Sequence, residues 1–408
     1  MQRKVLMITY YFPPVIYGSG IRVLNFAKYL TQYGWNSTVL TLNHSTFNVL
    51  KDFSLSERVK ESGIKVYAVN LIKVFSKIAS ANYPNVKREI SAEILSYLYK
   101  IASLNEPEEI WKSRATKLGE KILKSEKYNA IIAFVPPLST AQVGAYLAKK
   151  FKIPLIIDYS FIQNQKKSPS KTEEKLLRTS HSVIVDNRKI KDHLLQNYLF
   201  LDYNLVKIIP TGFEPFEFQN YVASSDDKFT LTFSSGKIGG KKIKLVLNAL
   251  AYLSKKEQLF KKSLLLNLIG IPTNEVINLI TKFQLKDNIR IYLNLNRENY
   301  IKTLLSSDFL LYLDDFDISN IPYDYAAVEK PYIAIVDGSN SFRYIIGDQK
   351  NSLIADTNEP SSIVLAFEKA FELFLNDRKL TPKINIENYD INRIIINLVR
   401  ELENFVYD

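Results

Sequence analysis

The sequence predicts an α/β protein made of two doubly wound domains in tandem. The chain has 408 residues, and at roughly 100 to 200 residues per domain this length predicts two or three domains. Short apolar runs recur along the chain and alternate with segments of helical spacing, as in parallel sheets whose strands are buried on both faces. Hydrophobic residues make up 46% and charged residues 24% of the chain, which is typical of packed globular domains.

The first domain begins with a strand, a glycine-containing loop, a helix and a second strand. Residues 4–11 form a continuous apolar run that ends at Pro13 and Pro14, and residues 21–33 place apolar side chains at helical spacing. Residues 36–42 supply the second strand and complete a strand–helix–strand unit. Further strands are predicted at residues 130–134, 154–158 and 182–185, and a mostly helical insertion covering one face of the domain at about residues 71–127.

The second domain repeats this alternation of strands and helices, after a junction where Pro210, Gly212 and Pro215 cluster. The expected domain ranges are therefore 1–208 and 209–385, followed by a segment 386–408 whose helix packs back on the first domain. Strands are predicted at residues 206–210, 229–234, 264–269, 289–293, 309–313 and 332–335, and helices at 242–255, 274–283 and 391–407.

Charge is concentrated in the first half of the chain. Residues 1–200 hold 30 Lys and Arg against 15 Asp and Glu, whereas residues 201–408 hold 24 against 27. An anionic membrane surface or a phosphorylated substrate explains this asymmetry, and so does a generally solvated basic face. Nucleic acid is not expected as a partner, because no zinc-finger spacing, Arg-Gly run or RNP motif is present.

Composition also excludes several kinds of site. With no Cys and three His (His44, His181 and His193), none within metal-ligand spacing of another, no metal site is expected. No signal peptide is evident, and the two long uncharged stretches, 5–21 and 129–148, each contain a Pro-Pro pair, so neither predicts a membrane span. We therefore expect a cytoplasmic protein.

The usual nucleotide-binding fingerprints are missing. Gly18 and Gly20 lie beyond a Pro-Pro pair and lack the third glycine of the dinucleotide motif, which disfavours an NAD enzyme. A Walker phosphate loop and a Gly-x-Ser-x-Gly nucleophile elbow are also absent from the sequence.

A series of segments nevertheless resembles one family. Residues 5–43 run from a strand through a Pro-Pro and glycine loop to an arginine-bearing helix, then through Gly34-Trp35 to the next strand. This stretch resembles the amino-terminal signature of the GT-B glycosyltransferases of family four. Order and spacing carry the resemblance over about the first 380 residues, through the further segments 107–111 (PEEIW), 133–140 (AFVPPLST), 153–161 (IPLIIDYSF), 207–213 (KIIPTGF), 233–242 (FSSGKIGGKK) and 323–335 (YDYAAVEKPYIAI).

The resemblance implies a donor site for a nucleotide diphosphate sugar. Ser235-Gly236-Lys237 with Lys242 looks like the family's Gly-Lys and later Lys, so Lys237 and Lys242 are the candidate catalytic residues that clamp the diphosphate and Gly236 lies beside it. A leaving diphosphate gains negative charge in the transition state, and in the absence of a metal, fixed cations and backbone N–H groups must stabilise it. The alternative is an exposed basic turn before a helix.

The glycine loop of the first domain resembles a second family feature. Gly18-Ser19-Gly20 looks like the loop whose backbone amides approach a phosphate or sugar, and a plain turn is the alternative. Arg22 is a candidate acceptor-side residue, and the alternative is that it is an ordinary surface arginine. Asp158, at a strand end, and His44, beyond the second strand, are the other acceptor-side candidates, although Asp158 could also be satisfied by backbone amides.

The family's paired glutamates are only partly matched. Aligning Lys330-Pro331 with the family's Gly-Lys-Pro places Asp324 at the second Glu, which holds the ribose, and Phe316 at the first, which reads the sugar. Asp315 or Asp317, one position away from Phe316, could supply that carboxylate instead. Ser319, Asn320 and Ile321 are expected to line the diphosphate pocket through their backbone, and residues 337–340 resemble the loop that covers the donor.

The resemblance implies a GT-B fold of two Rossmann-like domains facing across a cleft and a retaining, metal-independent glycosyltransferase. The donor would be a UDP- or GDP-sugar, no cofactor is expected, and the acceptor would be a glycan or lipid-linked molecule of polysaccharide biosynthesis, reached from the inner membrane face. Phe316 and the loss of the Arg-Asp-Pro-Trp segment after Asp158 favour the alternative of a degenerate GT-B binding or scaffolding subunit.

Overall fold

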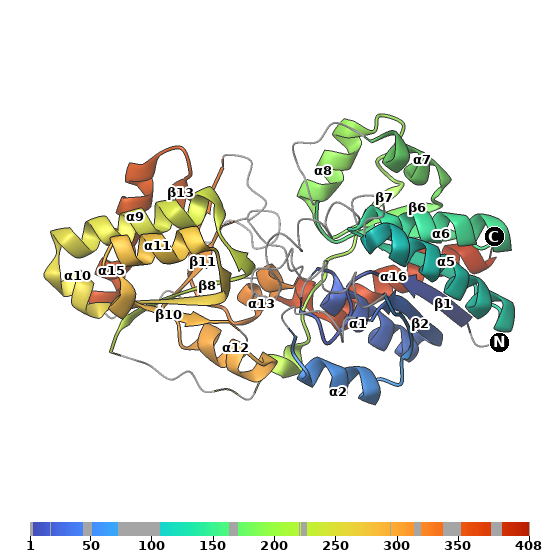
Figure 1. The fold of residues 1–408 in the computed structure, drawn as a ribbon, viewed down its shortest axis with the longest axis horizontal. Coiled ribbons are helices and arrows are strands. Elements are labelled where there is room, and N and C mark those ends of the chain that lie inside the picture. Colours follow the sequence, from blue (N-terminus) through green and yellow to red (C-terminus); the bar gives the residue numbers. More distant parts are fainter. Residues whose placement is uncertain are drawn as a thin grey trace, which may run out of the picture. The chain divides into compact units, whose positions relative to one another are not determined.

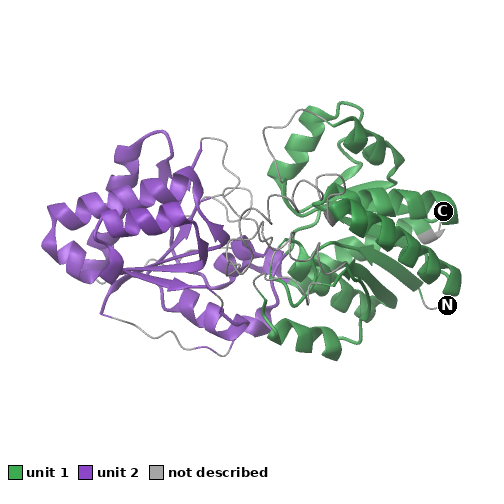
Figure 2. Ribbon diagram, viewed as in Figure 1, with its two compact units in different colours: residues 1–211, 391–408 green, residues 212–390 purple. Residues whose placement is uncertain are grey.

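The chain divides into two compact units, residues 1–211 with 391–408 (unit 1) and residues 212–390 (unit 2) (Figure 2). These boundaries lie a few residues beyond the expected ones at 208 and 385. The structure, a computed structural model, describes residues 3–16, 18–43, 51–71, 107–162, 170–219, 221, 227–293, 295–313, 320–337, 352–376 and 386–407.

Unit 1 is built on a parallel sheet. Its strands are β1 (Arg3–Ile8), β2 (Trp35–Leu42), β3 (Lys65–Val69), β4 (Ala130–Val135), β5 (Leu155–Tyr159), β6 (Ser182–Val185) and β7 (Val206–Ile208). They lie in the order β3-β2-β1-β4-β5-β6-β7, and every pair is parallel. Alternate residues of the central strands enter two apolar clusters on opposite faces, which explains why these strands are continuous hydrophobic runs in the sequence.

Helices cover both faces of this sheet (Figure 1). The strand residues of one face pack against α5 (Pro107–Ser125), α6 (Leu138–Phe151), α7 (Lys171–Thr179) and α8 (Arg188–Asn197). The other face packs against α1 (Gly20–Tyr29), α2 (Ser54–Glu61) and α16 (Ile391–Tyr407). A 3-10 turn, η1 (Leu30–Tyr33), follows α1 and ends at Gly34, whose φ of 76° lies in the left-handed region that glycine adopts freely.

The last helix belongs to unit 1 because of its apolar stripe. Ile391, Ile394, Ile395, Leu398 and Leu402 recur at helical spacing and are buried beside α1. Helix α16 (Ile391–Tyr407) therefore packs within unit 1.

Unit 2 contains a second parallel sheet. Its strands are β8 (Phe229–Ile238), β9 (Leu264–Pro272), β10 (Ile289–Tyr292), β11 (Phe309–Tyr312), β12 (Tyr332–Val336) and β13 (Leu353–Asp356). The order is β10-β9-β8-β11-β12-β13, again with parallel pairing throughout.

The sheet of unit 2 is also covered on both faces. One face packs against α9 (Gly240–Lys256), α10 (Gln258–Ser263), α11 (Asn274–Lys282) and α15 (Pro360–Leu375). The other packs against α12 (Arg297–Leu305) and α13 (Ile321–Ala327). The 3-10 turns are η3 (Pro215–Phe218), η4 (Lys286–Asn288) and η5 (Ile386–Tyr389).

Two predictions need correction. Strands β3 and β13 were not predicted, because β3 is largely exposed and β13 is half-exposed, so neither forms a buried apolar run. Strand β8 continues to Ile238 through an irregularity between Ser234 and Lys237, so Lys237 lies on the strand rather than in the following turn.

Of the expected helical insertion, 107–125 is helix α5, and 72–106 lies outside the described residues.

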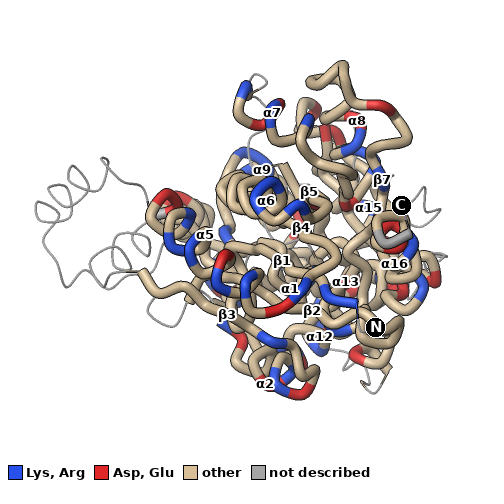
Figure 3. The backbone as a smooth tube through the Cα atoms, turned by 90° about the vertical axis from the view of Figure 1, so that its right-hand side faces the viewer, with Lys and Arg blue, Asp and Glu red and all other residues tan. Residues whose placement is uncertain are grey.

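The basic residues of unit 1 are spread over several helices, including α2, α5, α6 and α8 (Figure 3). Among the described residues, no helix has the length and apolar character needed to cross a bilayer.

Candidate functional site

The candidate residues follow the carboxyl ends of the parallel strands in both units. The strand order reverses direction between β1 and β4 in unit 1 and between β8 and β11 in unit 2. In open parallel sheets, ligands bind outside the carboxyl ends of the strands at such a reversal. The glycine loop follows β1, Gly236 and Lys237 lie near the end of β8, and Asn320 to Asp324 follow β11, so these candidates lie at the carboxyl ends of strands next to the two reversals.

At the end of β8 the backbone is tightly packed. Gly236 is buried and Lys237 is exposed, while the Ser235 hydroxyl donates to the Lys237 carbonyl at 3.1 Å. The neighbouring Gly270 on β9 has a φ of 136°, and a Cβ atom there would lie 1.8 Å from the Ser235 carbonyl oxygen. Only glycine fits at position 270, and its absence of a side chain lets β9 support the end of β8.

The amino terminus of α9 lies directly beyond this strand end. Gly239 precedes the helix without a side-chain cap, and no acidic residue lies in the first turn. Lys242 is 9% exposed, and its Nζ lies 4.0 Å from Oδ2 of Asp337, which follows β12. Because β11 lies between β8 and β12, the Lys242 ammonium group lies over the carboxyl end of the sheet, where helix N–H groups and a cation favour an anion.

Asp324 is held by an arginine that sequence reasoning missed. Arg297, the first residue of α12, donates from Nη1 to Asp324 Oδ2 at 2.6 Å and from Nη2 to Asp324 Oδ1 at 2.7 Å. The same guanidinium donates to Glu217 Oε2 at 3.0 and 2.6 Å, and Asn320 donates to Asp324 Oδ2 at 2.5 Å. Asp324 is 1% exposed, so this network fixes η3, α12 and α13 together.

Burial and charge act in opposite directions in this network. Burial raises the pKa of Asp324 above its ordinary value, against the attraction of Arg297. Although burial alone would lower it, the pKa of Arg297 is raised well above its ordinary value by the carboxylates of Asp324 and Glu217. Three hydrogen bonds between described residues reach the Asp324 carboxylate, which has about four acceptor positions.

The other predicted donor-side residues are only partly described. Asn320 is 5% exposed, and its Oδ1 has no hydrogen-bond partner among the described residues. Ile321 opens α13 and is buried. Ser319, Phe316 and residues 338–340 lie outside the described residues, as does His44.

The glycine loop of unit 1 packs closely against its own surroundings. Gly18 has a φ of 68°, and a Cβ atom there would lie 2.5 Å from the Tyr11 ring. Ser19 is buried with its hydroxyl 3.5 Å from that of Thr9, and Gly20 begins α1. A side chain at position 18 would therefore displace the loop, whatever the loop binds.

Arg22 and Asp158 are brought together by the fold. Arg22 Nε and Nη2 donate to Asp158 Oδ1 and Oδ2 at 2.9 and 2.7 Å, and both residues are 0% exposed. Nη1 of Arg22 also lies 3.4 Å from Asp186 Oδ1 and 3.3 Å from Thr211 Oγ1, and Thr211 donates to Asp186 through its backbone and hydroxyl. Arg22 is thus not a surface arginine, and Asp158 is satisfied by a guanidinium rather than by backbone amides alone.

The structure adds four residues to the two sites. Asp186 follows strand β6 directly, and that position after an apolar run was a usable signal for a polar group at the sheet edge. Thr211 lies in the segment 207–213, which the resemblance to the family already singles out. Glu217 lies in η3 and Arg297 begins α12, and no local pattern in the sequence distinguishes these two from other charged residues.

Comparison with known proteins identifies the fold. No protein-family model matches the chain, and no curated protein matches it. Solved structures do match: a glycosyltransferase from Rickettsia africae ESF-5 is 15% identical with a TM-score of 0.66 and 99% of both chains covered. Sucrose-phosphate synthase from Thermosynechococcus elongatus is 13% identical with a TM-score of 0.69, also with 99% of both chains covered.

A third similar structure was solved with ligands. HepE from Anabaena, in complex with UDP and glucose, is 14% identical with a TM-score of 0.66, covering 98% of this chain and 100% of HepE. At these identities the likeness concerns the fold. The chain therefore has the GT-B fold, with two Rossmann-like α/β units, as the sequence predicted.

Proposed function

We propose that this protein is a glycosyltransferase that moves a sugar from a nucleotide diphosphate donor, such as a UDP- or GDP-sugar, to a glycan or lipid-linked acceptor. The observation that carries the proposal is the position of Lys242. Its ammonium group lies beside the amino terminus of α9 and over the carboxyl ends of strands β8, β11 and β12. This is where a nucleotide diphosphate binds in a doubly wound fold. The UDP-bound structure of HepE, which has the same fold, supports the choice of ligand.

In the proposed donor complex, unit 2 binds the nucleotide and stabilises the leaving group. Lys237 and Lys242 neutralise the diphosphate, and the first N–H groups of α9 together with Gly236 donate to its oxygens. The backbone of Ser319, Asn320 and Ile321 lines the same pocket. Asp324 accepts one ribose hydroxyl at the acceptor position that its described partners leave open.

Transfer is proposed to proceed with retention and without a metal. The groups of unit 2 that we assign to the diphosphate are cations and backbone donors, which favour its departure. A leaving phosphate oxygen then takes the proton of the attacking hydroxyl, so the protein supplies position and charge.

Unit 1 is proposed to bind the acceptor. The acceptor-side candidates are His44, Arg22 and Asp158, and the buried Arg22–Asp158 pair holds α1 and the end of β5 in place. The glycine loop, Gly18-Ser19-Gly20, is proposed to approach a phosphate or sugar of the donor through its backbone amides. The basic charge of the first half of the chain fits a lipid-linked acceptor and a peripheral position on the inner membrane face, as in polysaccharide biosynthesis.

One observation favours a second candidate, a degenerate GT-B protein that works as a binding or scaffolding subunit. Arg297 occupies both oxygens of Asp324, the acidic residue assigned to the ribose. A protein that has lost sugar transfer would tolerate such a bridge, because it no longer needs this carboxylate to hold the donor's ribose in a reactive position.

Nucleotide titration separates the two candidates. UDP, GDP and the corresponding monophosphates are titrated by calorimetry and thermal shift against the full chain. A ligand at 100 times its dissociation constant adds about 2.7 kcal/mol of stability, which is readily measured. Binding of a diphosphate followed by hydrolysis or transfer of its sugar supports the glycosyltransferase; diphosphate binding without either reaction supports the degenerate binding subunit. Absence of any diphosphate binding contradicts the donor site.

A further inference from the structure

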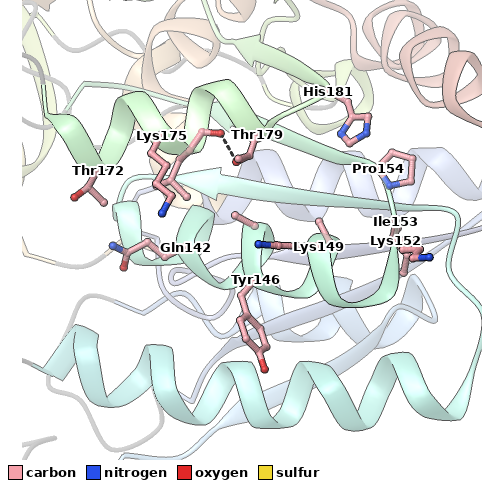
Figure 4. Close-up of a pocket in the computed structure, with 13 residues that line it drawn as sticks. Gln142, Tyr146, Lys149, Lys152, Ile153, Pro154, Thr172, Lys175, Thr179 and His181 are labelled. Carbon is pink, nitrogen blue, oxygen red and sulfur yellow. Dashed lines mark hydrogen bonds between the residues drawn. The ribbon is translucent and has the colours of Figure 1, made fainter.

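A groove lies between α6 and α7 on the helical layer of unit 1 (Figure 4). Its volume is about 770 Å³, within the range typical of small-ligand sites. Residues three and four positions apart lie on one face of a helix, and each helix presents such a stripe to the groove. These stripes include Gln142, Ala145 and Lys149 on α6, and Thr172, Lys175 and Thr179 on α7.

Small side chains keep the groove open. Ala145 and Ala148 on α6 and the two threonines of α7 are too short to fill the space between the helices. The floor is apolar: Ala148 is 8% and Leu176 is 7% exposed, and Ile153 and Pro154 line the end near the start of β5. The groove thus offers an apolar surface that water covers poorly.

The polar side chains of the groove carry positive charge. Lys149, Lys152 and Lys175 line it and are exposed, and no Asp or Glu is among the residues that line it. Neighbouring basic residues are paired: Lys150 binds Glu120 at 2.7 Å and Arg178 binds Glu174 at 2.8 Å. Within the part of the chain that the structure describes, the three groove lysines form no ion pair. Figure 4 shows the Lys149 and Lys175 side chains from opposite helices in the space between them.

A hydrogen-bond donor lies at the same end as Lys152. The backbone N–H of Leu155 donates to Nδ1 of His181 at 3.2 Å. Nδ1 is therefore the acceptor, which leaves Nε2 as the ring nitrogen able to donate. His181 lines the groove, so this end combines an N–H donor with an ammonium group.

We propose that this groove binds the phosphate headgroup of an anionic membrane lipid, with its apolar floor taking the adjoining glycerol and first methylene groups. Three lysines line the groove and no Asp or Glu is among its lining residues, which favours an anion, and the apolar floor favours an amphiphile over a free inorganic ion. The volume fits one small ligand rather than a folded partner. The proposal rests on the peripheral membrane position in the proposed function and is independent of sugar transfer.

The test uses cosedimentation of the full chain with vesicles. One set of vesicles is phosphatidylcholine, and the other contains phosphatidylglycerol at about one lipid in three, enough to give an anionic surface. The groove variant replaces Lys149, Lys152 and Lys175 by Gln. Its matched control replaces Lys117, Lys121 and Lys124 by Gln, three exposed lysines on α5 in the same helical layer. A third variant, Ala145→Leu, places a larger apolar side chain in the groove without changing its charge.

Wild type is expected to bind the anionic vesicles and not the neutral ones. The groove variant should bind them about tenfold or more weakly, because each lysine near an anionic surface contributes to attraction. The α5 control should stay within about threefold of wild type, and Ala145→Leu should weaken binding although its charge is unchanged. Inorganic phosphate should not compete at millimolar concentration, since it lacks the apolar part.

Several outcomes overturn the site. Equal losses in the groove and α5 variants assign the attraction to diffuse charge, and no binding of wild type to anionic vesicles removes the ligand. Competition by an acidic peptide but not by short-chain phosphatidylglycerol identifies a protein partner instead. UDP titration of the same variants keeps the two proposals apart: the groove variants should bind UDP as wild type does, whether or not they bind lipid.

Discussion

Arg22 on α1 and Asp158 at the end of β5 form a buried pair with two parallel hydrogen bonds of 2.9 and 2.7 Å. Both side chains are fully buried, and Asp186 and Thr211 complete the cluster around the guanidinium. The pair joins segments 136 residues apart in sequence. It therefore fixes the position of α1 relative to the carboxyl ends of β5 and β6, the edge at which unit 1 is proposed to bind its acceptor.

The first prediction concerns the stability of this cluster. Arg22→Met should lower the free energy of unfolding by about 3 to 5 kcal/mol, because it leaves two carboxylates buried without their guanidinium. Asp158→Asn should have an effect in the same direction, and the double variant should cost less than the sum of the two, since the residues contact each other. Urea unfolding followed by circular dichroism measures each value.

An exposed pair supplies the control for this prediction. Glu174 pairs with Arg178 on the surface of α7 at 2.8 Å, and Glu174→Gln should change the free energy of unfolding by no more than about 0.5 kcal/mol. If Arg22→Met were as mild as Glu174→Gln, the cluster would not hold unit 1 together as described.

The second prediction tests the diphosphate clamp. Lys242→Met and Lys237→Met should each remove on the order of 3 kcal/mol of transition-state stabilisation and weaken UDP binding. Lys241→Met is the matched control, because Lys241 lies between them in sequence and is exposed. Calorimetric titration with UDP and a transfer assay measure the two effects. A twofold change or less in both Lys237→Met and Lys242→Met would remove these residues from the site.

Strands that are buried on both faces can be predicted from the sequence, but the strands at the edges of the sheets cannot. Buried strands such as β4 and β6 show as apolar runs because both of their faces contact helices. Among the described strands, β13 pairs with β12 alone and is half-exposed, so its four residues give no comparable signal. The irregularity in β8 that places Lys237 on the strand depends on the close approach of Gly270, which no local pattern encodes.

The sequence predicts where the candidate residues lie better than it predicts which side chains they contact. Arg22, Asp158 and Asp324 were identified one by one from motifs, and each proved to lie at the carboxyl edge of a sheet. Their partners come from distant segments: Arg297 reaches Asp324 across 27 residues, and Arg22 reaches Asp158 across 136. Such contacts depend on strand order and register, which a single sequence does not specify.

The third prediction tests whether Asp324 accepts a hydrogen bond from a ribose hydroxyl in addition to those that it accepts from Arg297. Wild type should bind UDP more tightly than its 2′-deoxy analogue, because a site that accepts a hydrogen bond from a hydroxyl group discriminates against a ligand that lacks this hydroxyl. Asp324→Asn should lose this preference. Glu217→Gln is the control, since it also removes a carboxylate from Arg297 but leaves Asp324 unchanged. Equal affinity of wild type for both nucleotides would assign Asp324 to the structural network alone.

The last prediction concerns how the free energy of unfolding depends on pH in the acid range, through Glu126 of unit 1. Glu126, just beyond α5, accepts from Lys4 Nζ on β1 at 2.8 Å and from Lys65 Nζ on β3 at 2.7 Å. Hydrogen bonds from Lys4 and then Lys65 lower the pKa of Glu126 from its ordinary value of 4.5 to about 2. A carboxyl group whose pKa is lowered by folding stabilises the folded state above its ordinary pKa, and this contribution is lost as the pH falls from about 4.5 towards 2.

Glu126→Gln should therefore be less stable than wild type at pH 7, and the difference should shrink as the pH is lowered through that window. The effect is expected to be modest, because the carboxylate and both lysines are partly exposed to solvent and salt screens them. Urea unfolding at several pH values from 7 to about 3 measures it, with Glu61→Gln on the exposed surface of α2 as the control. A difference between Glu126→Gln and wild type that stays constant across this range would show that the loss comes from packing rather than from the charge of Glu126.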